Sequence, residues 1–323
     1  VGSNANASGN STSALGRQAN ASGTSSIALG HGAKALATSA TALGRGAIAN
    51  KGSALAVGAS SKATGVSATA VGPGSSAAGT SAVAVGHASR ATATNAAAFG
   101  RSAQATGFAS TAVGRGAVAS KSSSLAVGSL AAATGNQSTA VGVSAKAQGS
   151  SSTAVGRGAI ANKASAIALG VSAKAIGNRA TAVGVGAKAS NTDSVALGRA
   201  AIASHAGSTA IGFGAKTTKK NQIVLGKGNT QVTAPNLRQT GKGPANALLF
   251  ASKDGTLKRS NINPGSLSAL ASAIGSSSFQ AFLKDYSGLI PTADRKDRDG
   301  GGGGGGRYRL PKDVTTRNLT VND

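Results

Sequence analysis

Several residue types that build ordinary protein interiors and active sites are absent from this chain of 323 residues. It has no cysteine, methionine, tryptophan or glutamate, and only two tyrosines and six phenylalanines. The lack of cysteine excludes disulfides, thiolate metal sites and cysteine nucleophiles. The scarcity of large apolar residues argues against a generic globule of this length. No apolar run reaches the roughly 20 residues of a membrane-spanning helix. Because the chain begins at Val1, we expect a mature form or a fragment.

What the chain does contain is small residues and positive charge. Glycine occurs 48 times, and 33 lysines and arginines stand against eight acids, all aspartate, for a net charge of +25. Such a balance attracts polyanions, including acidic glycans, anionic lipid head groups and nucleic acid. Charge alone does not choose among these partners.

An internal repeat dominates the first two thirds of the chain. An apolar residue followed by glycine recurs every 14 residues, seventeen times without an insertion or deletion. We call this apolar residue the anchor and number other positions of the repeat from it. The anchors are Val1, Leu15, Leu29, Leu43, Val57, Val71, Val85, Phe99, Val113, Val127, Val141, Val155, Leu169, Val183, Leu197, Ile211 and Leu225.

Each repeat alternates with a period of two, which predicts strands. Position −1 is alanine from Ala14 to Ala210, and positions +4 and +6 are small. We predict two strands of about five residues per repeat, separated by turns that contain glycine. Strand pairs with this invariant spacing predict one rung of a parallel solenoid per repeat. A helical coiled coil is excluded because the repeat carries only one large apolar residue per two heptads.

The repeat itself resembles a known family. Ser-Thr-Ala-Val-Gly recurs at residues 110–114, 138–142 and 152–156, each followed by an Ala-x-Ala block. This unit is similar to the head repeat of trimeric autotransporter adhesins, the YadA-like heads. The resemblance covers about residues 1–226 and implies an all-β, left-handed parallel β-roll with 14-residue rungs and three chains around one axis. It also implies a homotrimeric fibrous adhesin displayed on the bacterial outer membrane, with a role in virulence and no enzymatic activity.

The orientation of the first strand of each repeat is open. One of its faces carries the anchors and position −2, and the other carries alanine and serine; neither face is charged. An uncharged ladder along a thin roll is typical of a protein interface. We favour the anchors inside the roll as structural residues, with the alanine and serine face near the subunit contacts. The second strand is expected to turn its alanines inward and its polar residues to water.

The basic residues recur at three positions of the repeat, +2, +5 and +8, so stacking would arrange them in columns. We take these columns as candidate binding sites for acidic glycan, lipopolysaccharide or a matrix protein, the alternative being that they only keep the rod soluble. Nucleic acid is disfavoured because stacking platforms need aromatic residues. The candidate residues are Arg45, Arg101, Arg115, Arg157, Arg199, Lys34, Lys62, Lys146, Lys174 and Lys188.

Catalytic and metal-binding patterns are not indicated. His31 and His87 lie four repeats apart, which prevents them from sharing a metal ion. Asp193 is the single acid of the repeat region, so paired-carboxylate catalysis and a serine–histidine–aspartate triad lack their residues. The recurring Gly-x-Gly follows the repeat and is interpreted as a corner rather than a nucleotide loop. We expect no cofactor and no metal.

The remainder of the chain divides by composition. After the roll (1–226) we expect a neck-like transition (227–240), then a small region with two short strands and a short helix (241–290). A charged, glycine-rich linker (291–309) and a tail (310–323), the possible start of a further unit, follow. The sequence is also compatible with the same roll used in a phage tail fibre or virion spike.

Overall fold

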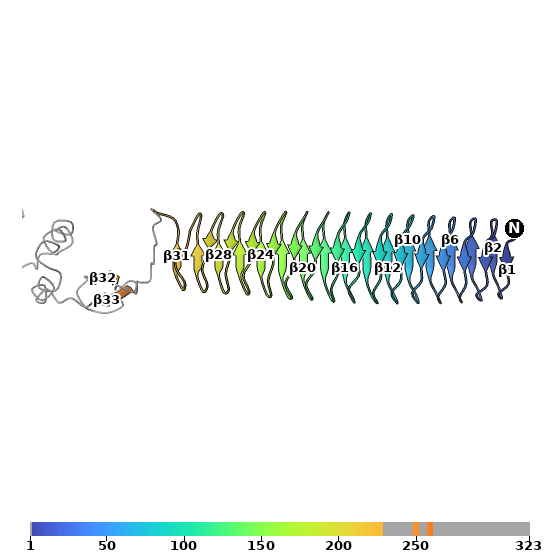
Figure 1. Ribbon diagram of the computed structural model, residues 1–323, viewed down its shortest axis with the longest axis horizontal. Coiled ribbons are helices and arrows are strands. Elements are labelled where there is room, and N and C mark those ends of the chain that lie inside the picture. The colour runs from blue at the N-terminus through green and yellow to red at the C-terminus, as the bar shows by residue number, and fades with distance from the viewer. Residues whose placement is uncertain (1, 229–247, 252–256, 261–323) are drawn as a thin grey trace, which may run out of the picture. The chain divides into compact units, whose positions relative to one another are not determined.

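The repeat region folds into a stack of rungs along one axis (Figure 1). The computed structural model describes residues 2–228, 248–251 and 257–260, and these contain strands and turns but no helix. The chain divides into two compact units, Val1–Val232 and Thr233–Asp323, which are considered separately. The first unit is a parallel β-solenoid in which each 14-residue repeat makes one rung, confirming the predicted architecture. The left-handed sense remains a prediction.

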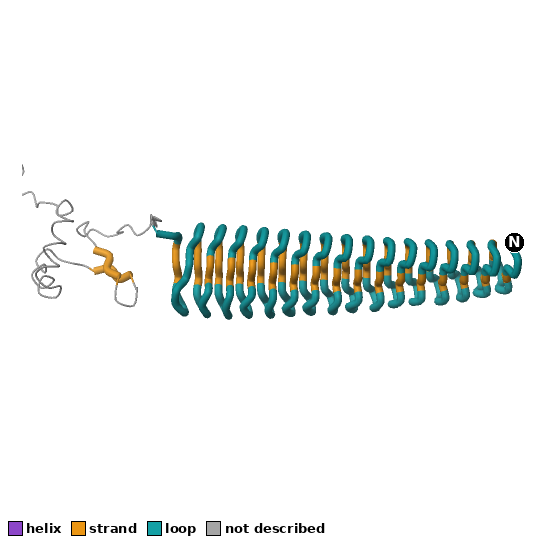
Figure 2. The backbone as a smooth tube through the Cα atoms, turned by 45° about the horizontal axis from the view of Figure 1, so that its top comes forward, coloured by secondary structure: helices purple, strands orange, loops and turns teal. Residues whose placement is uncertain are grey.

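Each rung contributes one strand to each of two parallel sheets, and Figure 2 shows strand segments alternating with loops along the roll. Sheet A has 15 strands and sheet B has 16. The register is 14 residues throughout, as in Lys146↔Ile160 of sheet A and Thr139↔Thr153 of sheet B. Residues i and i+14 are therefore lateral neighbours along the whole roll.

The strands of sheet A have two residues each. They are β1 (Asn6–Ala7), β3 (Asn20–Ala21), β5 (Lys34–Ala35), β7 (Ile48–Ala49), β9 (Lys62–Ala63), β11 (Ser76–Ala77), β13 (Arg90–Ala91), β15 (Gln104–Ala105), β17 (Val118–Ala119), β19 (Ala132–Ala133), β21 (Lys146–Ala147), β23 (Ile160–Ala161), β25 (Lys174–Ala175), β27 (Lys188–Ala189) and β29 (Ile202–Ala203).

The strands of sheet B have three residues each. They are β2 (Ser13–Leu15), β4 (Ile27–Leu29), β6 (Thr41–Leu43), β8 (Leu55–Val57), β10 (Thr69–Val71), β12 (Val83–Val85), β14 (Ala97–Phe99), β16 (Thr111–Val113), β18 (Leu125–Val127), β20 (Thr139–Val141), β22 (Thr153–Val155), β24 (Ile167–Leu169), β26 (Thr181–Val183), β28 (Val195–Leu197), β30 (Thr209–Ile211) and β31 (Ile223–Leu225).

These strands are shorter than the five residues predicted, because the corners consume more of each repeat. The residue at +3 and the residue at +10 adopt left-handed backbone conformations in most rungs, as at Ser144 (φ 57°) and Ser151 (φ 54°). The glycine at +1 is also at positive φ, for example Gly142 at 130°. A left-handed residue turns the chain sharply and ends an extended segment.

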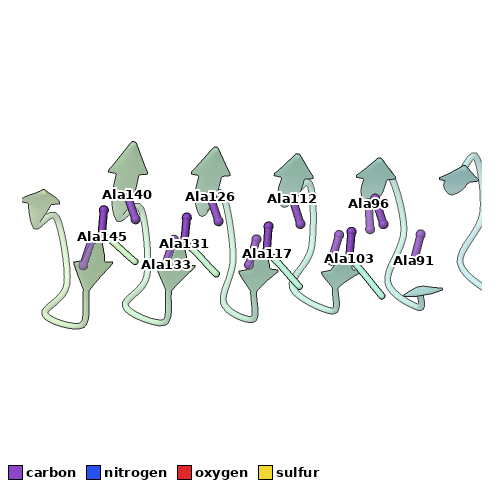
Figure 3. Packing of buried hydrophobic residues seen from close by; sticks show 14 of the residues in the cluster. Ala91, Ala96, Ala103, Ala112, Ala117, Ala126, Ala131, Ala133, Ala140 and Ala145 are labelled. Atoms are coloured by element: carbon purple, nitrogen blue, oxygen red, sulfur yellow. The ribbon is translucent and has the colours of Figure 1, made fainter. Parts of the chain in front are cut away.

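Alanine methyl groups fill the space between the two sheets. Positions −1, +4 and +6 point inward in nearly every rung, and Figure 3 shows Ala112, Ala117 and Ala126 projecting into this space. These side chains are fully buried. Within the described part of the roll, the largest fully buried side chain is a threonine, Thr217. The interior of the described roll therefore holds side chains no larger than that of threonine.

Buried serines at −3 and +4 bond to the backbone of their own corner. The Ser138 hydroxyl donates to the Gly135 carbonyl at 2.7 Å, and the Ser61 hydroxyl donates to the Gly58 carbonyl at 2.9 Å. These bonds satisfy a buried polar atom without reaching across the narrow interior. Ser26 and Ser152 hold buried hydroxyl oxygens with no hydrogen-bond partner.

The expectation that the anchors lie inside the roll is wrong. On sheet B the alanine at −1 and the serine or alanine at −3 face inward, whereas the anchor and position −2 face out and are half-buried or exposed. A leucine or valine is too large for an interior filled by methyl groups. The misplaced anchors are Leu15, Leu29, Leu43, Val57, Val71, Val85, Phe99, Val113, Val127, Val141, Val155, Leu169, Val183, Leu197, Ile211 and Leu225. The inward orientation of the second-strand alanines is confirmed.

The last rung is closed by polar side chains. The Gln222 amide oxygen accepts from the Thr218 and Lys219 backbone amides at 2.7 and 3.2 Å. Thr217 replaces the usual alanine at +6, and its hydroxyl lies 3.0 Å from that of Ser208. The bonds to Gln222 satisfy backbone amides at the end of the described roll, while the second contact joins two side-chain hydroxyls.

In the second unit, β32 (Leu248–Ala251) and β33 (Leu257–Ser260) pair antiparallel, which confirms the two short strands expected there. The connecting turn, the expected helix near residue 266, the glycine-rich linker and the tail lie outside the described residues, as does the neck-like transition from residue 229 onward.

Candidate binding surfaces

The outer surface of sheet B is an uncharged face that runs the length of the roll. It is formed by the anchors and by position −2, where threonine, valine, leucine and isoleucine predominate. Phe99 is 40% exposed and Leu29 is 42% exposed. All sixteen strands lack a charged residue on this face. An uncharged face with a row of exposed or half-buried apolar side chains along the whole roll is typical of an interaction site rather than of a face meeting water.

The basic residues lie on the other sides of the rung. Position +5 is on the outer face of sheet A, position +2 is on the turn that precedes each of its strands, and position +8 is on the turn that follows. The ten candidate residues are all exposed, and stacking brings them into columns rather than into one pocket: Arg45, Arg101, Arg115, Arg157 and Arg199 at +2, and Lys34, Lys62, Lys146, Lys174 and Lys188 at +5.

One ion pair joins two rungs at the turn that leads into sheet B. Arg179 Nε and Nη2 donate to Asp193 Oδ1 and Oδ2, both at 2.6 Å. The hydrogen bond from Arg179 lowers the pKa of the Asp193 carboxyl below its ordinary value, and the same bond raises the pKa of Arg179. Both side chains are exposed, so the pair links neighbouring rungs without building a buried site.

The sequence reasoning missed this pair, as well as a cation–π contact of Arg199 with Phe213, whose ring centroid is 4.3 Å from the guanidinium carbon. Both contacts join residues 14 apart. The signal was available, because a 14-residue period makes i and i+14 neighbours once the rungs stack in register.

The described part of the chain offers no metal site, since no three histidine, cysteine, aspartate or glutamate residues gather there. His31 and His87 are exposed at +2, as expected for a corner position. His205 at +8 has a buried Nδ1 atom without a hydrogen-bond partner. Within the described residues, no helix has the length and apolar character needed to cross a membrane.

These features define a class of protein: a repetitive parallel β-solenoid with an alanine interior, one uncharged face and three basic columns. Eight consecutive stretches match the family model described as the YadA head domain repeat (2 copies). They are residues 1–19, 21–47, 49–75, 77–103, 105–131, 133–159, 161–187 and 189–215. Because these stretches cover more than half of the chain, the chain belongs to the YadA head domain repeat family. This family is structural rather than enzymatic.

Among solved structures, the chain is similar to the crystal structure of the collagen-binding domain of the Yersinia adhesin YadA. The two are 21% identical, and the match covers 69% of this chain and 84% of the other at a TM-score of 0.19. No curated protein sequence matches the chain.

Proposed function

We propose that the chain is the head of a trimeric adhesin displayed on the bacterial cell surface, with no enzymatic role. Three identical rolls would attach to a host cell surface or extracellular matrix by multivalent, partly electrostatic binding. The observation that carries this proposal is the separation of surfaces on each rung, with an uncharged face on sheet B and cations elsewhere. Membership in the YadA head domain repeat family supports the adhesive role.

The uncharged face supports assembly through sheet B. A roll filled by alanine buries little apolar area per residue. Burial stabilises the fold by about 25 cal/mol per Å², whereas ordering the chain costs about 1.5 kcal/mol per residue. Packing the anchors of several chains against one another would bury much of the apolar surface that a single roll leaves exposed. The number three comes from the family resemblance, and the choice of face comes from the burial of the side chains.

The basic columns support an acidic ligand, such as acidic glycan, lipopolysaccharide phosphate or an acidic region of a matrix protein. Assembly through sheet B would leave positions +2, +5 and +8 available on every chain. Individually weak contacts on three chains would then act together and gain avidity. Binding of the full chain to heparin is expected to fall steeply with salt, because exposed charges are screened; salt-independent binding would contradict the electrostatic part of the proposal.

Assembly is tested by light scattering on the full chain, which should give about three times the mass of 30.5 kDa. A double variant, Val113→Asp with Val141→Asp, places carboxylates on the outer face of sheet B. A matched variant, Val118→Asp with Ile48→Asp, places them on the outer face of sheet A. We expect the first variant to dissociate towards the single-chain mass because buried charges would meet at the axis, and the second to remain assembled. A monomeric wild-type chain, or equal behaviour of the two variants, would refute assembly through sheet B.

A further inference from the structure

On the outer face of sheet A, near the end of the roll, neighbouring strands carry lysine, isoleucine and lysine in that order. Ile160 of β23 is paired in register with Lys146 of β21 on one side and Lys174 of β25 on the other. The same arrangement recurs in the next three rungs, where Ile202 of β29 is paired with Lys188 of β27 and bridged to Lys216. Six consecutive rungs thus present a row that we call the axial track: Lys146, Ile160, Lys174, Lys188, Ile202 and Lys216.

The turns beside the track add to its charge. The two rungs that carry isoleucine have arginine three residues earlier, Arg157 and Arg199, and these side chains are exposed. On the other side, Lys163 lies three residues after Ile160 and is exposed. Each half-buried isoleucine is therefore a small apolar patch with basic residues on the neighbouring rungs and on the flanking turns.

Two lysines of the track stand side by side without a separating residue. Lys174 and Lys188 are paired in register on neighbouring strands of sheet A, which lie about 4.8 Å apart. Like charges directly opposite each other destabilise a sheet. The one acid among the described residues, Asp193, is held by Arg179. An anion that neutralises this lysine pair must therefore come from outside the described part of the roll.

We propose that the axial track binds an acidic polysaccharide that lies along the roll axis. The inference rests on the proposed function and names its ligand class. Sugar rings have apolar C–H faces that can lie on Ile160 and Ile202, while carboxylate or sulfate groups reach the lysines between and beyond them. The lysines on either side of one isoleucine are two rungs apart, about 10 Å, which is comparable with one disaccharide. Single-stranded nucleic acid fits less well because the track offers its bases no aromatic side chain.

The roll contains a shorter copy and a natural control. Lys34, Ile48 and Lys62 repeat the lysine–isoleucine–lysine order on β5, β7 and β9. In contrast, Val118 of β17 is paired with Gln104 and Ala132, so its rung has the basic turns but no lysine above or below. This rung separates the effect of general positive charge from that of the track.

Binding of the full chain to immobilised heparin tests the track. The double variant Lys174→Gln with Lys188→Gln should weaken binding about tenfold, since it removes two charge-assisted contacts. The comparison variant Arg115→Gln with Lys121→Gln removes the same charge from the basic columns away from the track and should weaken binding clearly less, by about twofold, because single exposed contacts contribute little. A second comparison tests the isoleucines. The double variant Ile160→Ser with Ile202→Ser should lower the affinity for heparin without changing its salt dependence, whereas Val118→Ser should leave the affinity unchanged.

The possible outcomes separate this inference from the proposed function. Equal losses in the two charge variants would overturn the track while leaving salt-dependent adhesion by the basic columns in place. No heparin binding by the wild-type chain would overturn both the track and the electrostatic part of the proposed function. Tighter binding to a single-stranded thymidine oligonucleotide, with the same loss in the lysine variant, would overturn the polysaccharide assignment. The melting temperatures of all variants, followed by circular dichroism, verify that the roll is intact.

Discussion

Two glycines in one corner differ in what a single methyl group would do. Gly184 has φ +129°, and a Cβ added there would lie 2.5 Å from the carbonyl oxygen of Gly198 on the next rung. Gly186 has φ +67°, and a Cβ added there would meet nothing within 4 Å. The variants Gly184→Ala and Gly186→Ala are therefore chemically identical changes, two residues apart, with opposite surroundings.

The expected effects differ by several kcal/mol. At Gly186, the left-handed conformation costs alanine about 1–2 kcal/mol. Alanine also lowers the conformational entropy of the unfolded chain, which stabilises the folded state by about 0.4–1 kcal/mol. Ala200, in the equivalent position of the next rung, already has φ 56°, so the roll accepts alanine there. At Gly184, backbone strain of about 1–3 kcal/mol adds to a contact that must push two rungs apart. The bond from the Gly198 amide to the Val183 carbonyl, which spans the same gap and is now 2.8 Å, would then weaken by about 1 kcal/mol.

Thermal unfolding by circular dichroism, with hydrogen exchange of the flanking rungs, measures the difference. We expect Gly186→Ala to melt close to the wild type and Gly184→Ala to lose at least about 3 kcal/mol, with exchange rising in the rungs on both sides. Because a repeat array can unfold in parts, the exchange data locate the damage. Equal melting of the two variants would refute the close stacking of glycine corners from which this prediction follows.

Two further predictions concern polar groups. Ser138→Ala should lower the free energy of unfolding by about 1 kcal/mol because a 2.7 Å hydrogen bond is lost. Ser152→Ala should be neutral or stabilising because the Ser152 hydroxyl has no partner. Chemical denaturation in urea compares the two variants, and a larger loss of stability in Ser152→Ala would contradict these hydrogen-bond assignments. Since Arg179 lowers the pKa of Asp193, this pair contributes stability above the ordinary aspartate pKa and loses it as the pH falls through the lowered value. Asp193→Asn should remove that acid-dependent part of the melting curve, and the effect should be small because both groups are exposed; an unchanged pH dependence in the variant would argue against the pair.

The architecture was accessible to sequence reasoning because it depends on the period and on the pattern within each repeat. A spacing of 14 without insertions, with too few large apolar residues for a coiled coil, predicts rungs that stack in register, and the alternation within each repeat places two strands in a rung. The positions of the basic columns follow from the same period, as do the contacts between residues 14 apart, such as Arg179 with Asp193.

The orientation of the anchors could not be read from alternation, since a period of two defines two faces without saying which one is inside. The anchors varied among valine, leucine, isoleucine and phenylalanine, while position −1 was almost always alanine. That constancy was the informative feature, because a close-packed interior tolerates little change in volume, whereas an outer face accepts several sizes. Preference for the larger residue as the buried one led to the wrong choice.

By itself, then, the order of residues determined the rungs, the two parallel sheets and the columns of positive charge, because all three follow from a repeat of constant length. Only the tertiary structure decided that methyl groups fill the roll and that the large apolar side chains lie on its outer surface. The physical reason is the narrow space between the two sheets, in which the largest fully buried side chain of the described roll is a threonine, so that valine and leucine have no room there.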